Sequence, residues 1–557
     1  MLPAFFLLLL ASLPLGAQST QNDKCVVAGH VTNSLTGEPI KKAAVHLRPV
    51  NMRPPAQGTV QGYISTSEAD GRFEFDAVPA GDYLLMGDRS GYQFRSGTKL
   101  TLRPGQQAAD LTLKLTPQAV ISGKVVDEDG DPVGNGNVQV LRQVWQHGRL
   151  AYTMAGGGGV NDLGEFRVPR LAAGKYYVFA QTFTNMAMNE RPGIPGKPDI
   201  RPVRTFYPDA TSIDAAAAVQ VAPGQDATGI DIRLRSMQTY HVRGHVAGVL
   251  SKGESQRIML NLLPRGLGTM MPGAFTNVGS DLSFDLGGVA PGSYWLNAFT
   301  AGNRMMRGSA RQAVDVGAAD LNDVVLNIVP PGSLHGAVQV EGTPAGGVSA
   351  ANVAGIRVWL MPEEQGGPFA GSGQAVVGDN GTFQIEDVMP GRYYLQVSGN
   401  TGGAYLKAVR LGQQDVLGQE LDFSQGVSGE LEIIFRYGAA EVDGTVQLPQ
   451  NQNADTESAR VVLIPDTLNP DGSGIESSSL NQNGEFSVKQ LRPGHYRAYA
   501  FEKIDSNVLQ NPDVVKLLSA SGTDVDLNEN DRKQIQLPLI SADDTKQLLA
   551  RAGVDTQ

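Results

Sequence analysis

The chain has 557 residues, and its 45 basic and 56 acidic side chains give a net charge of −11. No cluster of Lys and Arg interleaves with aromatic residues, which disfavours nucleic-acid binding. The many glycines and prolines, 67 and 32 residues, are typical of short strands joined by turns.

The first residues, Met1 to Ala17, contain two phenylalanines followed by four leucines. This run is too short to cross a membrane, so we interpret residues 1–19 as a secretory signal peptide that is cleaved near Ala17 or Ser19. It has no basic residue, and a start codon further upstream is the alternative. No later run reaches the ~18 apolar residues of a membrane span. We therefore expect an exported protein that is periplasmic, outer-membrane-associated or extracellular.

The chain has a single cysteine, Cys25, which cannot form an internal disulfide. The residues before it, Asn22-Asp23-Lys24, lack the small apolar character that precedes a lipidated bacterial cysteine. We therefore expect an unpaired thiol on a mobile terminus. A secreted chain of this size without disulfides indicates a bacterial protein that is stabilised by its hydrophobic cores.

One short pattern occurs five times: a Phe, a Gly eight residues later and a Tyr two residues further on. Apolar alternation around the Phe predicts a strand, Pro and Gly predict the following turn, and Tyr-x-apolar predicts the next strand. An Asp-Gly or Asn-Gly turn precedes most copies, but the third copy has Asp281-Leu282, where we expect a different turn. The copies are Phe73/Gly81/Tyr83, Phe166/Gly174/Tyr176, Phe284/Gly292/Tyr294, Phe383/Gly391/Tyr393 and Phe486/Gly494/Tyr496.

A second pattern, apolar-x-Gly-x-Val, precedes each Phe pattern. From its glycine to the turn glycine the offset stays between 48 and 55 residues. Two patterns that remain in register five times indicate five repeats, and a glycine inside a strand marks a bulge or a close backbone approach. The opening glycines are Gly29, Gly123, Gly244, Gly336 and Gly444.

Further alternating segments give each repeat room for about seven strands and a sandwich core of its own. We expect an all-β chain of five such domains, arranged as beads on a string rather than as a solenoid. The expected boundaries are 24–116 (repeat 1), 117–236 (repeat 2), 237–329 (repeat 3), 330–437 (repeat 4), 438–540 (repeat 5) and 541–557 (a helical tail).

Two repeats carry additional segments. Repeat 2 has a run of four glycines at 156–159 and a Met/Pro-rich loop at 185–202, and we expect both to be mobile. In repeat 5, residues 512–520 predict a helix. The tail from Ser541 has acidic residues early, basic residues late and Gly553 as a stop, which predicts a capped helix.

With these motifs the chain resembles the carboxypeptidase regulatory-like (transthyretin-like) domain family, close to the collagen-adhesin B-type repeats. The shared features are the apolar-x-Gly-x-Val opening, an Asp-rich turn ending at Pro132, Asn-Gly-x-Phe and Pro-Gly-x-Tyr, and they extend from Val26 to about Leu539. Residues 205–210 and 229–234 are also similar to secreted acidobacterial proteins. The resemblance implies a seven-stranded, Ig-like or transthyretin-like β-sandwich per repeat. It implies no catalysis, since in peptidases this domain is the accessory one.

No catalytic or cofactor-binding residues are predicted. None of the seven histidines has a Glu three positions on, as the zinc pair of the related peptidases requires. His241 and His245 lie on one strand, about 13 Å apart at ~3.3 Å per residue, which is too far for one metal ion. The adhesin repeats often carry a Lys–Asn isopeptide bond with a Glu after Pro-Gly-x-Tyr. That Glu is absent in all five copies, so we expect no such crosslink.

Two groups of residues are candidate binding sites. Asp127, Asp129 and Asp131 have the carboxylate density of a calcium loop, although a solvated Asp-Gly turn is the favoured interpretation. The three tryptophans, Trp145, Trp295 and Trp359, are candidate platforms for a glycan, against the favoured alternative of surface or interface packing.

Three functions remain open from the sequence. The first is a non-catalytic, exported scaffold or adhesion protein that binds a polysaccharide or a cell-envelope protein. The second is a carbohydrate-binding protein that uses exposed aromatic residues. The third, an enzyme, is disfavoured because no reacting constellation can be named.

Overall fold

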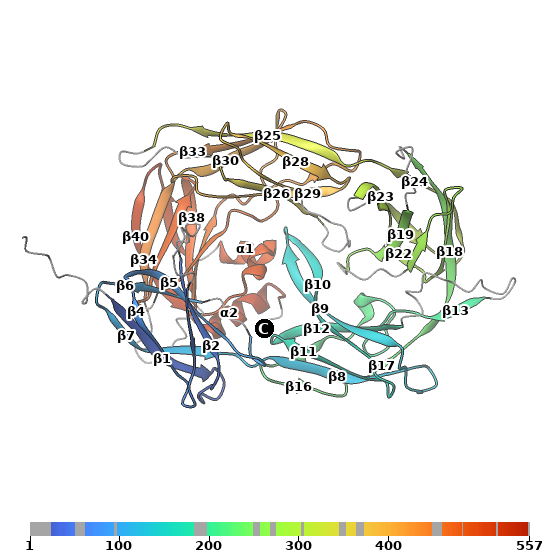
Figure 1. The fold of residues 1–557 in the computed structure, drawn as a ribbon, viewed down its shortest axis with the longest axis horizontal. Helices are drawn as coiled ribbons and strands as arrows, with labels where there is room; N and C mark the ends of the chain where they lie inside the picture. Colours follow the sequence, from blue (N-terminus) through green and yellow to red (C-terminus); the bar gives the residue numbers. More distant parts are fainter. Residues whose placement is uncertain are drawn as a thin grey trace, which may run out of the picture. The chain divides into compact units, whose positions relative to one another are not determined.

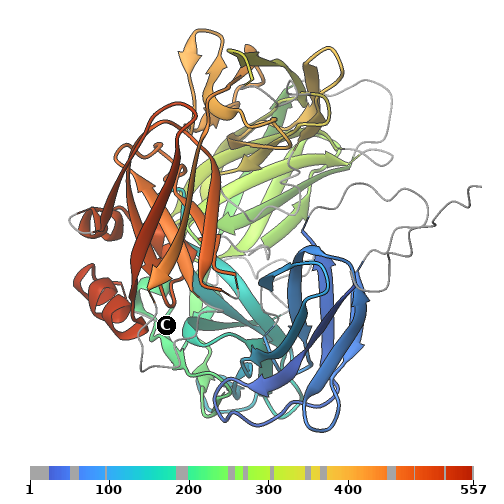
Figure 2. The ribbon, with the colours of Figure 1, turned by 90° about the vertical axis from the view of Figure 1, so that its left-hand side faces the viewer.

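The computed structural model describes residues 24–50, 62–93, 97–182, 198–248, 257–267, 274–301, 306–344, 353–363, 373–447, 459–481, 483–519 and 522–554 (Figures 1 and 2). The expected signal peptide and residues 185–197 of the expected loop lie outside these ranges. The chain divides into two compact units, Met1–Thr116 and Pro117–Gln557. The first unit is repeat 1, and the second contains the other four repeats.

Repeat 1 is a sandwich of two sheets. One sheet has the strand order β4-β1-β7, in which β1 pairs antiparallel with β4 and parallel with β7. The other has the order β3-β2-β5-β6. The strands are β1 (Cys25–Asn33), β2 (Ala44–Pro49), β3 (Tyr63–Thr66), β4 (Arg72–Val78), β5 (Gly81–Asp88), β6 (Thr98–Leu102) and β7 (Gln107–Leu115).

Repeat 2 follows the same plan with longer and additional strands. One sheet has the order β11-β8-β16, with β17 also paired to β8, and the other has the order β10-β9-β12-β14, with β15 also paired to β12. The elements are β8 (Ala119–Val126), β9 (Gly136–Gln146), β10 (Arg149–Gly159), β11 (Glu165–Leu171), β12 (Gly174–Thr182), β13 (Asp199–Pro202), β14 (Thr205–Phe206), η2 (Ile213–Ala215), β15 (Val219–Val221), β16 (Asp226–Ala227) and β17 (Ile232–Arg233).

Repeat 3 borrows a strand from repeat 2. Strand β13 pairs antiparallel with the start of β18, so residues 199–202 of the expected mobile loop form part of a sheet. The sheet orders are β13-β18-β21, with β24 also paired to β18, and β20-β19-β22-β23. The strands are β18 (Ser236–Gly248), β19 (Arg257–Pro264), β20 (Ala274–Asn277), β21 (Ser283–Val289), β22 (Gly292–Ala301), β23 (Met306–Val316) and β24 (Leu321–Ile328).

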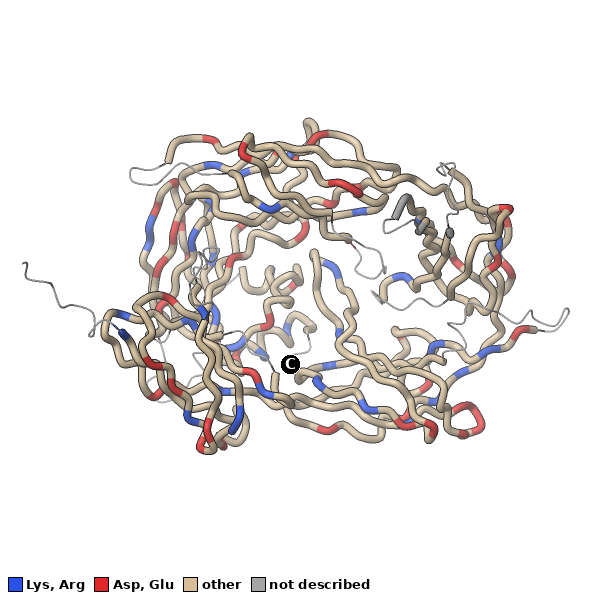
Figure 3. Tube along the Cα trace, viewed as in Figure 1, with Lys and Arg blue, Asp and Glu red and all other residues tan. Residues whose placement is uncertain are grey.

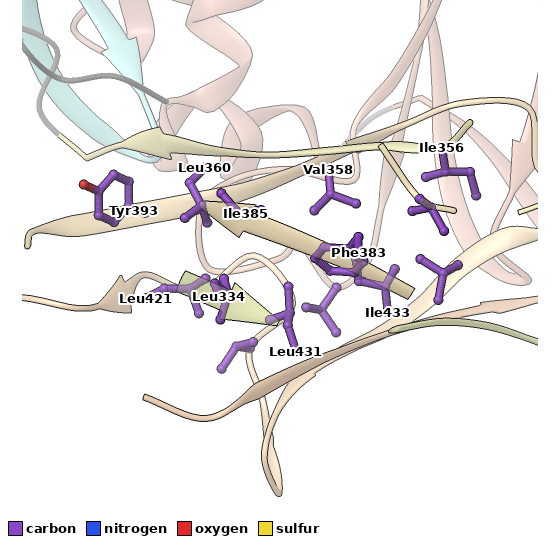
Figure 4. Close-up of a cluster of buried hydrophobic side chains, with 14 of the residues drawn as sticks. Leu334, Ile356, Val358, Leu360, Phe383, Ile385, Tyr393, Leu421, Leu431 and Ile433 are labelled. Atoms are coloured by element: carbon purple, nitrogen blue, oxygen red, sulfur yellow. The ribbon is translucent and has the colours of Figure 1, made fainter. Parts of the chain in front are cut away.

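Repeat 4 has the sheet orders β28-β25-β33-β30-β31 and β27-β26-β29-β32. Its core brings together Leu334, Phe383, Ile385 and Ile433 from one sheet and Val358 and Leu360 from the other (Figure 4). The strands are β25 (Gly332–Glu341), β26 (Arg357–Pro362), β27 (Gln374–Val376), β28 (Thr382–Val388), β29 (Arg392–Ser398), β30 (Tyr405–Leu411), β31 (Gln414–Asp415), β32 (Leu421–Asp422) and β33 (Glu430–Arg436).

Repeat 5 adds helices to the sandwich. Its strands form one path, β36-β35-β38-β40-β34-β37, with β39 paired to β38. Helices α1 and α2 pack a second hydrophobic cluster, which includes Tyr499, Phe501, Val514 and Leu549, against the outer side of the sandwich (Figure 2). The elements are β34 (Ala440–Gln447), β35 (Arg460–Pro465), β36 (Glu476–Ser479), β37 (Glu485–Leu491), β38 (Gly494–Phe501), η3 (Ser506–Gln510), α1 (Pro512–Leu518), β39 (Thr523–Leu527), β40 (Arg532–Ile540) and α2 (Ala542–Arg551).

Both predicted helices are present, and each begins with a side-chain cap, which the sequence predicts for the tail helix. Asn511 accepts a hydrogen bond from the Asp513 N–H at 2.9 Å at the start of α1. Ser541 accepts one from the Asp544 N–H at 3.1 Å at the start of α2. Such caps satisfy amide groups that the first helical turn leaves without intrahelical partners.

The two sequence patterns meet as neighbouring residues on adjacent strands. In every repeat the opening glycine lies directly opposite the Phe of the second pattern. Five clusters of buried hydrophobic side chains, one within each repeat, include the phenylalanines of these pairs. The pairs are Gly29–Phe73, Gly123–Phe166, Gly244–Phe284, Gly336–Phe383 and Gly444–Phe486.

The opening position requires glycine because the closing part of each repeat approaches it too closely for a side chain. A Cβ atom at Gly444 would lie 2.1 Å from the carbonyl oxygen of Ile535 and 2.7 Å from Cζ of Phe486. The corresponding Cβ at Gly29 would lie 2.0 Å from the carbonyl oxygen of Leu111. The predicted close backbone approach is therefore confirmed, and the Phe ring covers the bare glycine backbone.

The conserved spacing of the tyrosine has an equally local cause. In each repeat its hydroxyl donates a hydrogen bond to the carbonyl oxygen four residues earlier, at the start of the Pro/Gly turn. The bond closes the turn and satisfies a hydroxyl whose ring is largely in the core. The bonds are Tyr83–Pro79 (3.0 Å), Tyr176–Ala172 (2.7 Å), Tyr294–Ala290 (2.9 Å), Tyr393–Met389 (2.7 Å) and Tyr496–Arg492 (2.8 Å).

The turn before the third Phe strand is the same as in the other repeats, so the expected difference was wrong. Leu282 has φ 66°, and Gly71 has φ 81° at the equivalent position. Both donate their N–H to the carbonyl three residues earlier, at 3.0 Å in Leu282 and 3.1 Å in Gly71. A left-handed Leu costs about 1–2 kcal/mol. Its side chain packs against the repeat 3 core, which offsets part of that cost.

The glycine run of repeat 2 is a strand, not the expected mobile loop. Residues Gly156, Gly157, Gly158 and Gly159 continue β10 and pair with β9. Gly156 and Gly158 lie close to the neighbouring β11, where a Cβ would lie 3.0 Å from Val168 Cγ1 and 3.0 Å from the Arg167 carbonyl oxygen, respectively. Glycine is used here for close packing rather than for flexibility.

Cys25 also differs from expectation. Its side chain is fully buried in the repeat 1 core, and its Sγ donates a hydrogen bond to the Arg103 carbonyl oxygen at 3.0 Å. The thiol is free. Because β1 begins at this residue and follows the alternating pattern of Val27 and Val31, Cys25 acts as the first core residue of the strand.

Substituting Gly444→Ala should destabilise repeat 5 by about 1–3 kcal/mol, because the added methyl group collides with backbone and ring atoms. Hydrogen exchange of the full chain should show faster exchange in β34 and β40. Gly317→Ala is the matched control, since a Cβ there meets nothing within 4 Å. Equal exchange in both variants would contradict this explanation of the opening glycine.

The sandwiches should lose stability in alkali. Burial raises the pKa of Tyr393 and of Tyr496 to about 12, and it raises the pKa of the other three turn tyrosines. The unfolded chain releases these protons near pH 10, so the stabilising contribution is complete below about pH 10 and is lost as pH rises to about 12. Tyrosinate absorbance and circular dichroism should change together. Ionisation of these tyrosines at a pH well below the pH of unfolding would contradict the prediction.

Candidate functional site

The β9–β10 hairpin of repeat 2 has longer strands than the equivalent hairpins of the other repeats. Both strands have 11 residues, whereas the first strand of the equivalent hairpin in repeats 1, 4 and 5 has 6. Its tip is the pair His147-Gly148, with φ of 51° and 69°. Positive φ at both positions is typical of a tight hairpin turn. The hairpin tip contacts repeats 4 and 5, and we call these contacts the clasp.

Charged side chains join the tip to repeat 4. Arg149 forms an ion pair with Glu363 and lies 3.9 Å from Glu420. Arg392 of repeat 4 lies 3.2 Å from Glu420, so two guanidinium groups neutralise two carboxylates. The carboxylates are largely buried, and burial together with the neighbouring Glu363 raises the pKa of Glu420. Arg149 therefore balances charge that repeat 4 would otherwise hold in a partly buried place.

An aromatic stack lies beside these ion pairs. The His147 ring is parallel to Tyr394 of repeat 4, with 3.9 Å between ring centroids and 13° between the ring planes. Burial lowers the pKa of His147, and the carboxylates of Asp471 and Glu363 oppose that shift. The neutral imidazole is therefore the form favoured in the stack at pH 7.

Repeat 5 holds the same hairpin through the segment that precedes its first helix. Arg142 of β9 forms an ion pair with Asp505 at 2.6 Å, and both side chains are about three-quarters buried. The backbone N–H of His147 donates to Gln510 Oε1 at 2.8 Å. Asp505 also caps η3, where its Oδ1 accepts from the Asn507 N–H at 3.0 Å. The same residues thus order this segment of repeat 5 and receive the hairpin.

The clasp joins repeats 2, 4 and 5 within the compact unit Pro117–Gln557. The sequence did not predict the clasp, because alternation along one strand gives no information about a partner in another repeat. Two signals were nevertheless present: the long alternating segment on either side of His147-Gly148, and the 121 residues between Gly123 and Gly244, more than between other successive opening glycines.

The predicted tryptophans lie on three different sandwiches, and the structure brings none of them together. Trp145 is on β9, opposite Leu150, within the clasp hairpin. Trp359 is a half-buried residue of β26, opposite Gln374 on one side and Gln396 on the other.

Trp295 lies under arginines. The guanidinium carbon of Arg311 lies 4.2 Å from the ring centroid and that of Arg265 lies 5.9 Å from it. Arg265 also pairs with Asp315 at 2.6 Å. Cation–π contact occupies the indole face that a sugar ring would use.

The acidic candidate Asp127, Asp129 and Asp131 forms a turn. Oδ1 of Asp127 accepts hydrogen bonds from the N–H groups of Asp129 and Asp131, at 3.0 and 2.9 Å. Gly130 takes φ 93° within the turn. Among the residues that the structure describes, no group of three or more His, Cys, Asp or Glu side chains has the arrangement of a metal site.

His241 and His245 flank Gly244 on β18, as the sequence indicates. His241 Nδ1 lies 2.5 Å from Asp285, and Arg243 bridges Asp285 and Asp320 at 2.9 and 2.7 Å. His245 and Arg243 line a shallow cleft of about 700 Å³ in repeat 3. Because Arg243 forms ion pairs with both aspartates, the charges at this cleft largely neutralise one another.

Residues 26–116, which lie in repeat 1, match the profile of the Carboxypeptidase regulatory-like domain. No curated protein matches the chain.

Several solved structures resemble parts of the chain. A minor pilin of Streptococcus agalactiae is 12% identical, with 41% of this chain and 99% of the pilin covered and a TM-score of 0.22. Two B repeats of the Staphylococcus aureus collagen-binding protein are 12% identical, with 74% of this chain and 99% of that chain covered and a TM-score of 0.13. The Bacillus anthracis TIE protein is 11% identical, covering 55% of this chain and 50% of that protein, with a TM-score of 0.17. These TM-scores are too low to support a conclusion about function.

Lys and Arg positions are interspersed with Asp and Glu positions along the Cα trace (Figure 3). Within the described residues, no helix is long and apolar enough to cross a membrane.

Reversing the charge of Arg149 should loosen the attachment of the hairpin tip. In Arg149→Glu a third carboxylate faces Glu363 and Glu420, and we expect the His147 amide to exchange with solvent at least about tenfold faster, as measured by hydrogen exchange. Arg72→Glu is the control, because it breaks an exposed ion pair with Glu74 inside a single strand of repeat 1. Unchanged protection of His147 would show that the clasp does not depend on this charge.

Proposed function

We propose that this chain is a non-catalytic, exported scaffold or adhesion protein. The residues that recur in all five repeats have roles in folding: the glycine permits a close approach, the Phe covers it and the Tyr closes a turn. The recurring residues therefore serve to build the sandwich in every repeat. Individual functions belong to the outer faces, which differ from repeat to repeat.

The clasp is the observation that carries the scaffold proposal. Arg142, His147 and Arg149 contribute contacts to repeats 4 and 5 rather than to their own core. A chain that serves only as a flexible spacer has no need for such contacts. A chain that presents surfaces in a fixed relation to one another benefits from them.

The proposed location and partner rest on the sequence. We infer export from the leucine-rich start, Met1 to Ala17, and a place in the periplasm, at the outer membrane or outside the cell. The partner is a polysaccharide or a cell-envelope protein. The net charge of −11 favours a partner that is not a polyanion.

Glycan binding through an aromatic residue is the second candidate, and Trp359 is the observation that favours it. Its ring is half-buried and its neighbours across the sheet are Gln374 and Gln396. An aromatic ring supplies a flat apolar surface, and amides can both donate to and accept from sugar hydroxyls. Among the three tryptophans, this one has the most suitable surroundings.

A glycan array and a cell-envelope pull-down should separate these candidates. With the mature full chain we expect saturable retention by a cell-envelope fraction, unchanged in Trp295→Ala and Trp359→Ala variants that retain the wild-type melting temperature. Glycan binding that falls about tenfold in Trp359→Ala alone would favour the second candidate. An uncleaved chain confined to the cytoplasm would overturn the exported assignment.

A further inference from the structure

Strand β10 of repeat 2 is a long sheet edge. It is the last strand in the order β10-β9-β12-β14, and within the described part of the chain no strand pairs with its other side. The strands at the same place in the other four repeats are also sheet edges, but they have only 4, 4, 3 and 4 residues, whereas β10 has 11. Short edge strands limit pairing with other chains. Repeat 2 lacks this protection.

The geometry of the hairpin shows which backbone groups of β10 point away from β9. The hairpin loop has two residues, so the residues that flank it form a hydrogen-bonded pair, and such pairs alternate with non-hydrogen-bonded pairs along antiparallel strands. Leu150, Tyr152 and Met154 occupy the non-hydrogen-bonded positions, and a bulge interrupts the register after Met154. Their N–H and C=O groups therefore point toward the edge of the sheet.

Neither charge nor proline protects this edge. Natural edge strands often carry Lys or Pro, which discourage pairing, but residues 150–159 contain no charged residue and no proline. The side chains of Leu150 and Met154 are 48% and 43% exposed. Tyr152 lies between them on the same face, with its ring edge-on to Tyr177 at 5.5 Å between ring centroids. The edge therefore combines outward backbone groups with a row of apolar side chains.

The clasp holds this edge in place. The edge begins directly after Arg149, which forms an ion pair with Glu363, and the tip is further held by the stack of His147 on Tyr394. A hairpin that is fixed at its tip loses less conformational freedom when a partner binds than a hairpin with a free tip. The edge is thus continuous with an interface between repeats and is pre-organised by it.

The molecule itself shows what can cover such an edge. In repeat 3 the start of β18 pairs with β13, a short extended segment whose sequence belongs to repeat 2. A second copy of the chain is a less suitable cover for β10, because pairing over residues 150–154 alone is far smaller than the ~1,200 Å² that a stable interface buries. The addition of a single extended segment needs only a few backbone pairs and room for alternate side chains.

We propose that the edge of β10 binds an extended, uncharged segment of a partner protein, which adds to the sheet as a further strand and carries apolar side chains at every second position. This inference rests on the proposed function and states what the cell-envelope partner presents. The backbone of the segment pairs with Leu150, Tyr152 and Met154. Its apolar side chains lie opposite these residues and share their face. The absence of charge in residues 150–159 matches an uncharged segment.

Hydrogen exchange of the full chain at single-residue resolution tests the edge, with a ten-residue peptide of alternating Val and Thr as the probe. Without peptide, the Leu150, Tyr152 and Met154 amides should exchange faster than those of Ala151 and Thr153, which bond to β9. The peptide should slow exchange at the first three amides at least about tenfold. Protection of other elements by the peptide, with none in β10, would overturn the proposal.

N-methylated peptides test the pairing without any change to the protein. Valines that lie opposite Leu150 and Met154 direct their N–H groups toward β10, whereas the threonines direct theirs to solvent. Methylation of the valine nitrogens should therefore abolish binding. Methylation of the threonine nitrogens should preserve binding, and it also keeps the peptide from pairing with itself. Equal binding of the two methylated peptides would contradict strand addition.

A matched pair of variants tests the same contact from the side of the chain. Met154→Pro removes an N–H that points to the edge and leaves the β9 ladder intact, so peptide binding should weaken about tenfold or more. Met154→Thr keeps the N–H and should lose less affinity. Both variants should retain the wild-type melting temperature and the protection of the His147 amide. Equal affinity of the two variants would overturn the proposal.

The remaining outcomes separate this inference from the proposed function. If the cell-envelope fraction retains the chain but no peptide protects β10, the inference fails and the proposed function stands. If the peptide binds β10 but no envelope fraction retains the chain, the edge site stands and the proposed function fails. Self-association of the chain that protects the same three amides without peptide would assign the edge to a second copy and overturn the proposed partner.

Discussion

The contact on which each sandwich depends is the approach of a backbone carbonyl to the opening glycine. The distance between a hypothetical Cβ at Gly244 and the Val324 carbonyl oxygen is 1.9 Å, so no other residue fits without movement of a strand. This approach brings the first strand beside the closing strand in parallel, and it positions the Phe opposite the glycine to cover the exposed backbone. The turn that carries the Tyr then follows directly from the Phe strand. The close approach at the glycine, the Phe that covers it and the Tyr turn are thus structurally linked in each repeat.

With the inner faces determined in this way, variation is confined to the outer faces. Repeat 5 covers its outer face with α1 and α2, through a cluster that includes Phe501 and Leu549. Repeat 2 packs Leu141 and Phe206 with Leu267 of repeat 3 on its own outer face. An outer sheet face that buries apolar side chains needs a cover, and in this chain the cover comes from a helix or from another repeat. Repeats 2 and 3 therefore pack against each other although each has a separate core.

The sequence predicts those features that depend on neighbours along the chain or on a periodic pattern. The close backbone approach at the opening glycine, the strand–turn–strand order of the Phe/Tyr pattern and the cap at Ser541 are of this kind. The prediction of a different turn at Leu282 was wrong because the turn pattern shows only the conformational cost of a positive φ. The packing that offsets this cost comes from the repeat 3 core, which the turn pattern does not describe. The prediction of a mobile loop at 156–159 was wrong for a related reason. Glycine permits both flexibility and close packing, and the close packing here depends on Val168 of the neighbouring strand. The partners of His147 lie more than 200 residues away, and no short-range pattern encodes them.

The contacts of the clasp are ion pairs, a hydrogen bond and one aromatic stack. Such contacts require a defined geometry, so they select one arrangement of the repeats rather than many. The Arg149 side chain remains 66% exposed, and exposed ion pairs contribute only about 0–1 kcal/mol each and weaken in salt. The better buried contacts, the Arg142–Asp505 pair and the His147–Tyr394 stack, must therefore provide most of the attachment, while Arg149 provides its specificity.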